Sequence, residues 1–205
     1  MSFETVTLEV ADVTAATRFY SAFGLGTQIG LRESDAPSAG FRGFSMSVTV
    51  SQPSGVDAFV GAALDAGATP LKPAAKSFWG YGGVVRAPDG TIWKIATSAK
   101  KNTGPATREI DQLVLLLGAA DVAGSKRFYV EHGLAVAKSF GRKYVEFAPS
   151  SGPVKLALYG RRALAKDVGV PEEGSGSHRL VLGGDRAFTD PDGFAWEAAS
   201  LTAAP

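Results

Sequence analysis

The side chains that could hold a metal ion or move a proton are few in this chain. Its 205 residues include two histidines, His132 and His178, and no cysteine. Without thiolates, a transition-metal site must use imidazole, carboxylate or amide ligands. His132 ends a predicted helix, where an imidazole fits the helix dipole, so a structural role is expected for it. His178 begins a predicted strand after a glycine–serine loop, where it is either a hydrogen-bonded strand-end residue or a metal ligand.

Glu197 also has two interpretations. It follows Trp196 in a predicted strand and should point to the face opposite the indole, because side chains alternate along a strand. On that face it is either a solvated carboxylate or an inward-facing ligand or base. Lys94, in the matching strand of the first half, pairs either with a substrate carboxylate or with Glu9.

Two aromatic segments are candidates for ligand binding. Phe78, Trp79 and Tyr81 stand among glycines and form either a lid over a ligand or an aromatic plug. In the second half, the segment 140–144 is a predicted hairpin turn in which Arg142 and Lys143 either receive an anionic group or are simply solvated. The predicted ligand-binding residues are Lys94, Trp79, Tyr81, Arg142, Tyr144 and Tyr159.

These residues are positioned by a unit that occurs twice. An Ala-Asp-Val, Phe-Tyr and Gly-Leu series begins at Ala11 and again at Ala120, with the same interval between all three counterparts. Each copy is closed by Pro-Asp-Gly and a tryptophan, Trp93 or Trp196. A regular internal repeat indicates two copies of one structural unit.

The hydrophobic pattern predicts alternating strands and amphipathic helices in both copies. The predicted helices are 13–23, 56–66, 122–132 and a short one at 161–168. The predicted strands are 4–10, 25–31, 44–50, 84–86 and 91–97, then 110–117, 134–139, 143–147, 154–159, 178–182 and a closing strand from 194. The segment 76–83 is expected to be irregular because it is rich in glycine.

Composition excludes several classes of protein. The chain is 45% apolar and 20% charged with a formal net charge of +1, which is typical of a globular protein and gives no indication of nucleic-acid binding. It has neither a signal-peptide pattern nor an apolar run long enough to span a membrane. The expectation is therefore a cytoplasmic protein that binds neither nucleic acid nor membranes, as a monomer or homodimer.

The repeated phrases resemble the glyoxalase / bleomycin-resistance / extradiol-dioxygenase superfamily, whose fold is also called vicinal oxygen chelate. The resemblance covers most of the chain. It implies an α+β fold of tandem βαβββ modules, with curved open sheets around cavities and helices outside. The expected domains are residues 1–98, a linker at 99–107, and residues 108–205.

Relatives of this kind place metal ligands on the first and last strands of paired modules. In the first copy these positions fall on Thr5, Ser45 and Lys94, which are poor ligands, so the resemblance implies a metal-free cavity there with Trp79 and Tyr81 near its mouth. In the second copy they fall on Gln112, Ala157, His178 and Glu197. Gln112, His178 and Glu197 are therefore the predicted ligands of one divalent ion (Zn, Ni, Mn or Fe).

The resemblance leaves two functions open for a small-molecule ligand. The first is a metal-dependent lyase, isomerase or dioxygenase, in which the ion stabilises an enolate-like intermediate and Glu197 or Glu146 acts as base. The second is a non-catalytic protein that binds and sequesters a small molecule such as an antibiotic or toxin, without a metal cofactor. The residues do not decide between them.

Overall fold

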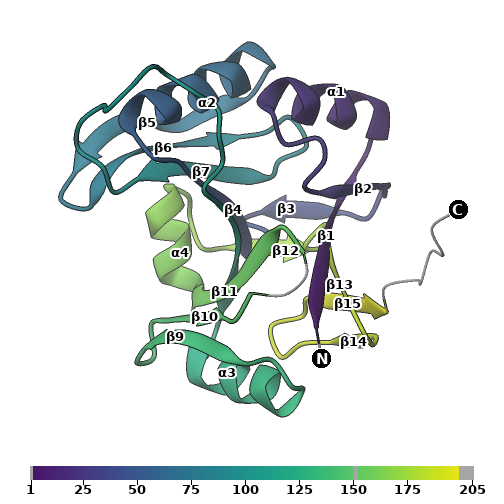
Figure 1. Ribbon diagram of the computed structural model, residues 1–205. Coiled ribbons are helices and arrows are strands. Elements are labelled where there is room, and N and C mark those ends of the chain that lie inside the picture. The colour runs from purple at the N-terminus through teal and green to yellow at the C-terminus, as the bar shows by residue number, and fades with distance from the viewer. Residues whose placement is uncertain (1, 150–151, 199–205) are drawn as a thin grey trace, which may run out of the picture.

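The computed structural model describes residues 2–149 and 152–198, and their strands form two curved sheets and a small two-stranded one (Figure 1). The helices are α1 (Val13–Phe23), α2 (Pro53–Asp65), α3 (Val122–Glu131) and α4 (Arg161–Val168). The strands of the first half are β1 (Phe3–Val10), β2 (Gly30–Glu33), β3 (Ser38–Gly40), β4 (Phe44–Thr49), β5 (Thr69–Ser77), β6 (Gly80–Arg86) and β7 (Ile92–Thr97). Those of the second half are β8 (Gln112–Ala119), β9 (Val136–Phe140), β10 (Tyr144–Phe147), β11 (Val154–Gly160), β12 (Gly174–Gly176), β13 (Leu180–Gly184), β14 (Phe188–Thr189) and β15 (Ala195–Ala198).

The larger sheet contains two complete βαβββ modules. Its strand order is β5-β6-β7-β4-β8-β11-β10-β9, so the order within β4–β7 is repeated within β8–β11. Strands β4 and β8 pair antiparallel at the centre, from Phe44 opposite Leu117 to Thr49 opposite Gln112. One module comes from each half of the sequence, and the two form a single hydrogen-bonded sheet.

The smaller sheet is built from β1 and β2 of the first half and from β13, β14 and β15 of the second. Its order is β14-β15-β13-β1-β2, and its central pair joins β1 from the first half to β13 from the second. The α+β fold of curved sheets predicted from the repeat is confirmed. The boundaries at 98 and 108 stay a prediction about the repeating unit, because both sheets combine strands from the two halves.

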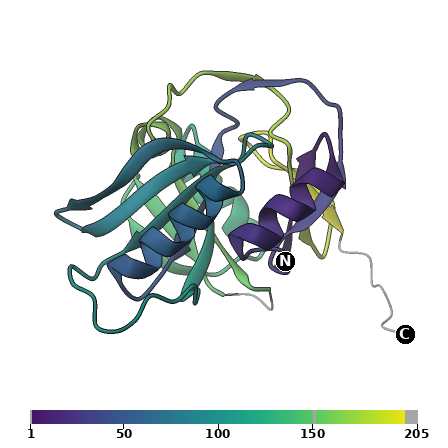
Figure 2. The same ribbon diagram turned by 90° about the horizontal axis from the view of Figure 1, so that it is seen from above.

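The two faces of the larger sheet carry different side chains. One face contributes Met46, Trp93, Leu115 and others to the main core, which α1, α2 and α3 cover from outside. Figure 2 shows α1 and α2 side by side over this face. The opposite, concave face packs against α4, whose Leu164, Ala165 and Val168 are buried in a second apolar cluster. Three helices therefore lie outside as predicted, and α4 lies inside, between the two wings of the sheet (Figure 1).

The repeated Phe-Tyr and tryptophan residues form the same contact in both copies. The ring centroids of Tyr20 and Trp93 are 5.7 Å apart, and those of Tyr129 and Trp196 are also 5.7 Å apart. Each tyrosine hydroxyl donates to an aspartate in the turn before the closing strand, at 2.6 Å for Tyr20 and Asp89 and 2.5 Å for Tyr129 and Asp190. The tyrosine–tryptophan contact is thus repeated, whereas the accepting aspartate lies within Pro-Asp-Gly in the first copy and just before it in the second.

Two predicted elements differ from the structure. The glycine-rich segment 76–83 is not irregular, because β5 and β6 form an antiparallel hairpin with Ser77 opposite Gly80 at its end. The strand predicted at 25–31 begins only at Gly30, because the chain first turns at residues 26–28. Within the described ranges, no helix combines the length and apolarity needed to cross a membrane.

The two tyrosine–aspartate hydrogen bonds should contribute differently to the stability of the fold. Asp190 is 5% exposed, whereas Asp89 is only partly buried. Tyr129→Phe therefore leaves a buried carboxylate with one donor fewer and should lower the free energy of unfolding by about 1–3 kcal/mol. Tyr20→Phe should cost less, since water can replace its hydroxyl on Asp89. Urea denaturation of both variants measures the difference, and equal losses would contradict the assigned role of burial.

Candidate functional site

Most of the predicted site residues lie around three separate cavities, and Gln112 and Tyr144 lie outside their linings. We call the first the basic cavity; it measures about 1120 Å³ and is lined by Arg142, Lys143, Tyr159, Arg161, Arg162, Lys166, Glu172 and Glu173, among others. The second, of about 510 Å³, is the tryptophan cavity, lined by Lys72, Lys76, Trp79, Tyr81, Lys94, Asp167 and small residues. The third, of about 410 Å³, is the glutamate cavity, lined by Glu9, Arg32, Ser177, His178, Glu197 and others.

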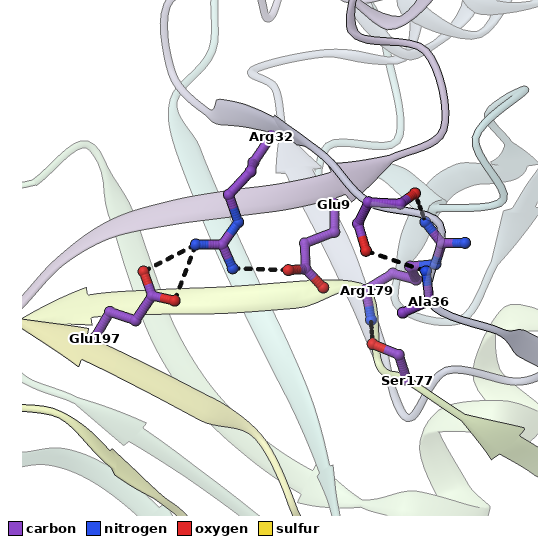
Figure 3. A network of polar contacts seen from close by, with 7 residues as sticks. Glu9, Arg32, Ala36, Ser177, Arg179 and Glu197 are labelled. Carbon is purple, nitrogen blue, oxygen red and sulfur yellow. Dashed lines mark hydrogen bonds and ion pairs between the residues drawn. The ribbon is translucent and has the colours of Figure 1, made fainter.

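An arginine holds both carboxylates of the glutamate cavity (Figure 3). Arg32 on β2 donates to Glu9 on β1 at 2.7 Å and to both carboxylate oxygens of Glu197 on β15 at 2.9 and 3.0 Å. The hydrogen bond that Arg32 donates to Glu9, followed by those to Glu197, raises the pKa of Arg32. The guanidinium thus supplies the positive charge between two carboxylates that a metal ion would supply in a metalloprotein.

His178 lies in the same cavity with both ring nitrogens against backbone carbonyls. Nδ1 is 2.5 Å from the carbonyl oxygen of Arg42 and Nε2 is 3.2 Å from that of Asp192. The ring also stacks on Phe194 at a centroid distance of 4.1 Å. A nitrogen that ligates a metal needs a free lone pair directed at the ion, and neither nitrogen presents one to the cavity.

The structure does not bring the three predicted metal ligands together. Gln112 begins β8 in the larger sheet, beside Thr49, whereas Glu197 is on β15 in the smaller sheet. Among the described residues, no three histidine, cysteine or carboxylate side chains are grouped to hold a metal. The residues present therefore do not fit the divalent ion that the resemblance implies.

The three positions assigned to the first copy also separate. Thr5 lies on β1 in the smaller sheet, Ser45 is fully buried on β4, and Lys94 lines the tryptophan cavity. Ala157, the fourth position of the second copy, is buried on β11. Only Lys94 shares a cavity with Trp79 and Tyr81, as predicted for that site.

Lys94 pairs with a carboxylate that the sequence did not indicate. Its Nζ lies 2.6 and 2.9 Å from the two carboxylate oxygens of Asp167, near the end of α4. The predicted alternative, a pair with Glu9, is wrong because Glu9 is on the other sheet with Arg32. Lys72 donates to the carbonyls of Lys166 and Asp167, so a second cation binds the C-terminal end of α4.

The basic cavity contains Arg142 and Tyr159 from the predicted ligand-binding set. Tyr144 lies next to Tyr159, and the centroids of the two rings are 6.2 Å apart in an edge-to-face arrangement. The hydroxyl of Tyr144 donates to Glu146 at 3.1 Å. Burial, helped by the Glu146 carboxylate, raises the pKa of Tyr144. Glu146 itself lies near Lys138 and Lys155, at 3.6 and 3.8 Å, so this candidate base already has two cations beside it.

Sequence reasoning missed Arg32 and Asp167, the two residues that neutralise the candidate ligands. Neither belongs to the repeated phrases, and the short strand β2 has no alternating pattern that would place Arg32 on the inner face. The other histidine, His132, is structural as expected. Its Nδ1 is 2.7 Å from the carbonyl of Phe128, on whose ring it stacks.

Comparison with known proteins identifies the fold. By sequence, the chain matches no family model and no curated protein. Its structure is similar to that of glyoxalase I from Zea mays, with a TM-score of 0.59 and 12% identity over 95% of this chain and 90% of that chain. A point variant of the maize enzyme gives the same TM-score and identity, covering 92% of that chain.

The chain has the vicinal oxygen chelate fold. The resemblance seen in the repeated phrases is thereby confirmed at the level of the fold. A glyoxalase/bleomycin resistance protein/dioxygenase family enzyme from Burkholderia phytofirmans also matches, with 19% identity over 48% of this chain and 99% of that chain, but its TM-score of 0.40 supports no conclusion. At these identities the shared fold carries no information about substrate or reaction.

Replacing Arg32 by methionine should destabilise the smaller sheet. The Glu9 side chain is only 15% exposed, so losing the guanidinium leaves it without a counter-charge, whereas Glu197 is 53% exposed and hydrated. We expect Arg32→Met to lower the free energy of unfolding by about 1 kcal/mol, the value of a partly screened ion pair.

The double variant Glu9→Gln/Arg32→Met should recover part of that loss, because no unpaired charge then remains near β1. Arg18→Met, on the exposed face of α1, is the matched control and should be neutral. Urea denaturation measures all three. Full stability of Arg32→Met would show that the arginine does not act as the internal counter-charge.

Proposed function

We propose that the protein binds a small anionic organic molecule in the basic cavity, without a divalent metal as co-ligand. This is the second of the two functions that the sequence leaves open. The observation that supports it is the convergence of five cationic side chains on one cavity, against two acidic ones. Its volume of about 1120 Å³ is ample for a small organic ligand.

Most of these cations are free to bind a ligand. Arg161 is used internally, since it donates to the carbonyl of Phe41 at 3.0 Å and lies over that ring. The side chains of Arg142, Lys143, Arg162 and Lys166 have no hydrogen bond or ion pair with any part of the chain that the structure describes. Unpaired cations that surround one concave space provide a binding site for an anion.

Two elements hold the cations in place. Arg162 and Lys166 are four residues apart on α4 and therefore share a helix face. Arg142 and Lys143 lie in the turn between β9 and β10, and the carbonyl of Lys143 accepts from the amide of Gly160 at 3.3 Å. This bond ties the turn to the start of α4, so both pairs of cations border the same opening.

Tyr159 gives the cavity an aromatic wall. Burial, with a further contribution from Asp167, raises the pKa of its phenol, which stays neutral at physiological pH. The hydroxyl has no hydrogen-bond partner within the described residues and can donate to a ligand. A ring beside cations favours an anion that carries an aromatic or other flat apolar group.

The metal-dependent alternative has less support. Its predicted ligands lie on different sheets, both nitrogens of His178 face carbonyls, and Glu197 is paired with Arg32. A catalytic function would have to use chemistry other than that of a metal held by Gln112, His178 and Glu197.

Calorimetric titration with phenyl phosphate tests the proposal, with phenyl glucoside as an uncharged control. We expect phenyl phosphate to bind and the glucoside not to bind. Arg142→Ala and Arg162→Ala should each weaken binding by about tenfold or more, because each removes a charge-assisted hydrogen bond.

Arg127→Ala is the matched control, since it removes the same charge from the exposed face of α3. Its affinity should equal that of the parent protein. The proposal fails if phenyl phosphate does not bind at millimolar concentration, if the glucoside binds equally well, or if Arg127→Ala has the same effect as the two cavity variants.

A further inference from the structure

We infer that the tryptophan cavity is a second binding site, for an aromatic carboxylate whose carboxylate group replaces that of Asp167 on Lys94. This site lies beside Asp167, near the C-terminal end of α4, and shares no lining residue with the basic cavity. The inference therefore does not depend on the proposed function.

The ion pair of Lys94 and Asp167 is the first observation. Both oxygens of the carboxylate lie within 2.9 Å of Nζ, yet each side chain is 32% exposed. An ion pair with this exposure is weak and can exchange partners, because water and other ions compete for both groups. Asp167 thus occupies Lys94 in the way that the carboxylate of a ligand would.

The charge of the cavity is the second observation. Lys72, Lys76 and Lys94 line it together with a single carboxylate, Asp167. Lys72 is engaged by the carbonyls at the end of α4, and Lys76 has no partner within the described residues. An incoming carboxylate would therefore meet a net positive field even when Asp167 remains nearby.

The exposed aromatic tip of the β5–β6 hairpin is the third observation. Phe78 and Trp79 are 80% and 82% exposed, at the margin of the molecule where this hairpin ends (Figures 1 and 2). Their rings touch edge to face at 5.0 Å, and only Trp79 lines the cavity. Tyr81 follows on the same strand, but its side chain lies on the α2 face of the sheet, where its hydroxyl donates to Asp57 at 2.8 Å.

Small residues make the floor of the cavity flat. Gly82 on β6 lies between Ala75 and Ala96 on the two neighbouring strands. A planar ring can lie on this floor, with the indole of Trp79 at its edge and Nζ of Lys94 at its far end. The combination of a flat floor, an aromatic rim and one exchangeable cation selects an aromatic carboxylate.

Trp79 supplies a specific signal for the test. The other tryptophans, Trp93 and Trp196, are 0% and 2% exposed, so quenching by acrylamide in solution reports almost entirely on Trp79. Titrations with benzoate would use the Arg142→Ala/Arg162→Ala background, so that binding in the basic cavity cannot produce the signal. We expect benzoate to protect Trp79 from acrylamide and uncharged benzamide to have little effect.

Asp167→Asn is the decisive variant. If the inference is correct, it should raise the affinity for benzoate by about fivefold, because the internal competitor for Lys94 is removed. A purely structural role for Asp167 predicts the opposite or no change. Asp65→Asn, on the exposed surface of α2, removes the same charge elsewhere and should leave the affinity unaltered.

Lys94→Met should weaken benzoate binding by about tenfold or more, since it removes a charged donor. Circular dichroism would establish that this variant folds. Should it not fold, Trp79→Phe with calorimetric detection serves instead, and a modest loss of affinity is expected. Unchanged binding in Asp167→Asn, or full binding by benzamide, would overturn the inference, whatever the outcome in the basic cavity.

Discussion

The pairing of β4 with β8 is the contact on which the rest of the structure depends. It joins the two complete modules edge to edge in one sheet. The side chains of Met46, Val48, Leu113 and Leu115 on these two strands are almost fully buried in the main core. A central strand pair with one fully buried face has a fixed register, because a slip of one residue would move the apolar set to the other face. The positions of the cavities on the concave face depend on this strand pair.

The sequence predicted well those structural features that depend on residues of a single copy. The repeated Asp12 and Asp121 cap helices that begin where expected, and the Phe-Tyr and tryptophan phrases form equivalent contacts. These features depend on residues close in sequence or on a motif with one geometric solution. Alternation along β1 and β4 also gave the correct faces for their side chains.

Partners across the two copies could not be predicted in the same way. Alternation says which face a residue occupies but not which strand lies beside it, so Gln112 and Glu197 were assigned to one site although they belong to different sheets. Arg32 stands in a short strand without a periodic pattern, and Asp167 in a short helix whose periodicity identifies its buried face but not the partner of this carboxylate. Their importance comes from charge compensation across long separations, which only the three-dimensional arrangement reveals.

The pairing of β1 with β13 has a consequence for the order of folding. Strand β1 is synthesised well before its partner β13, with which it pairs from Phe3 opposite Gly184 to Leu8 opposite Leu180. The larger sheet draws its strands from the interior of the sequence and can close before β13 has been synthesised. Contacts so distant in sequence form slowly. The smaller sheet should therefore assemble last, and until then β1 is an open edge to which another chain could bind.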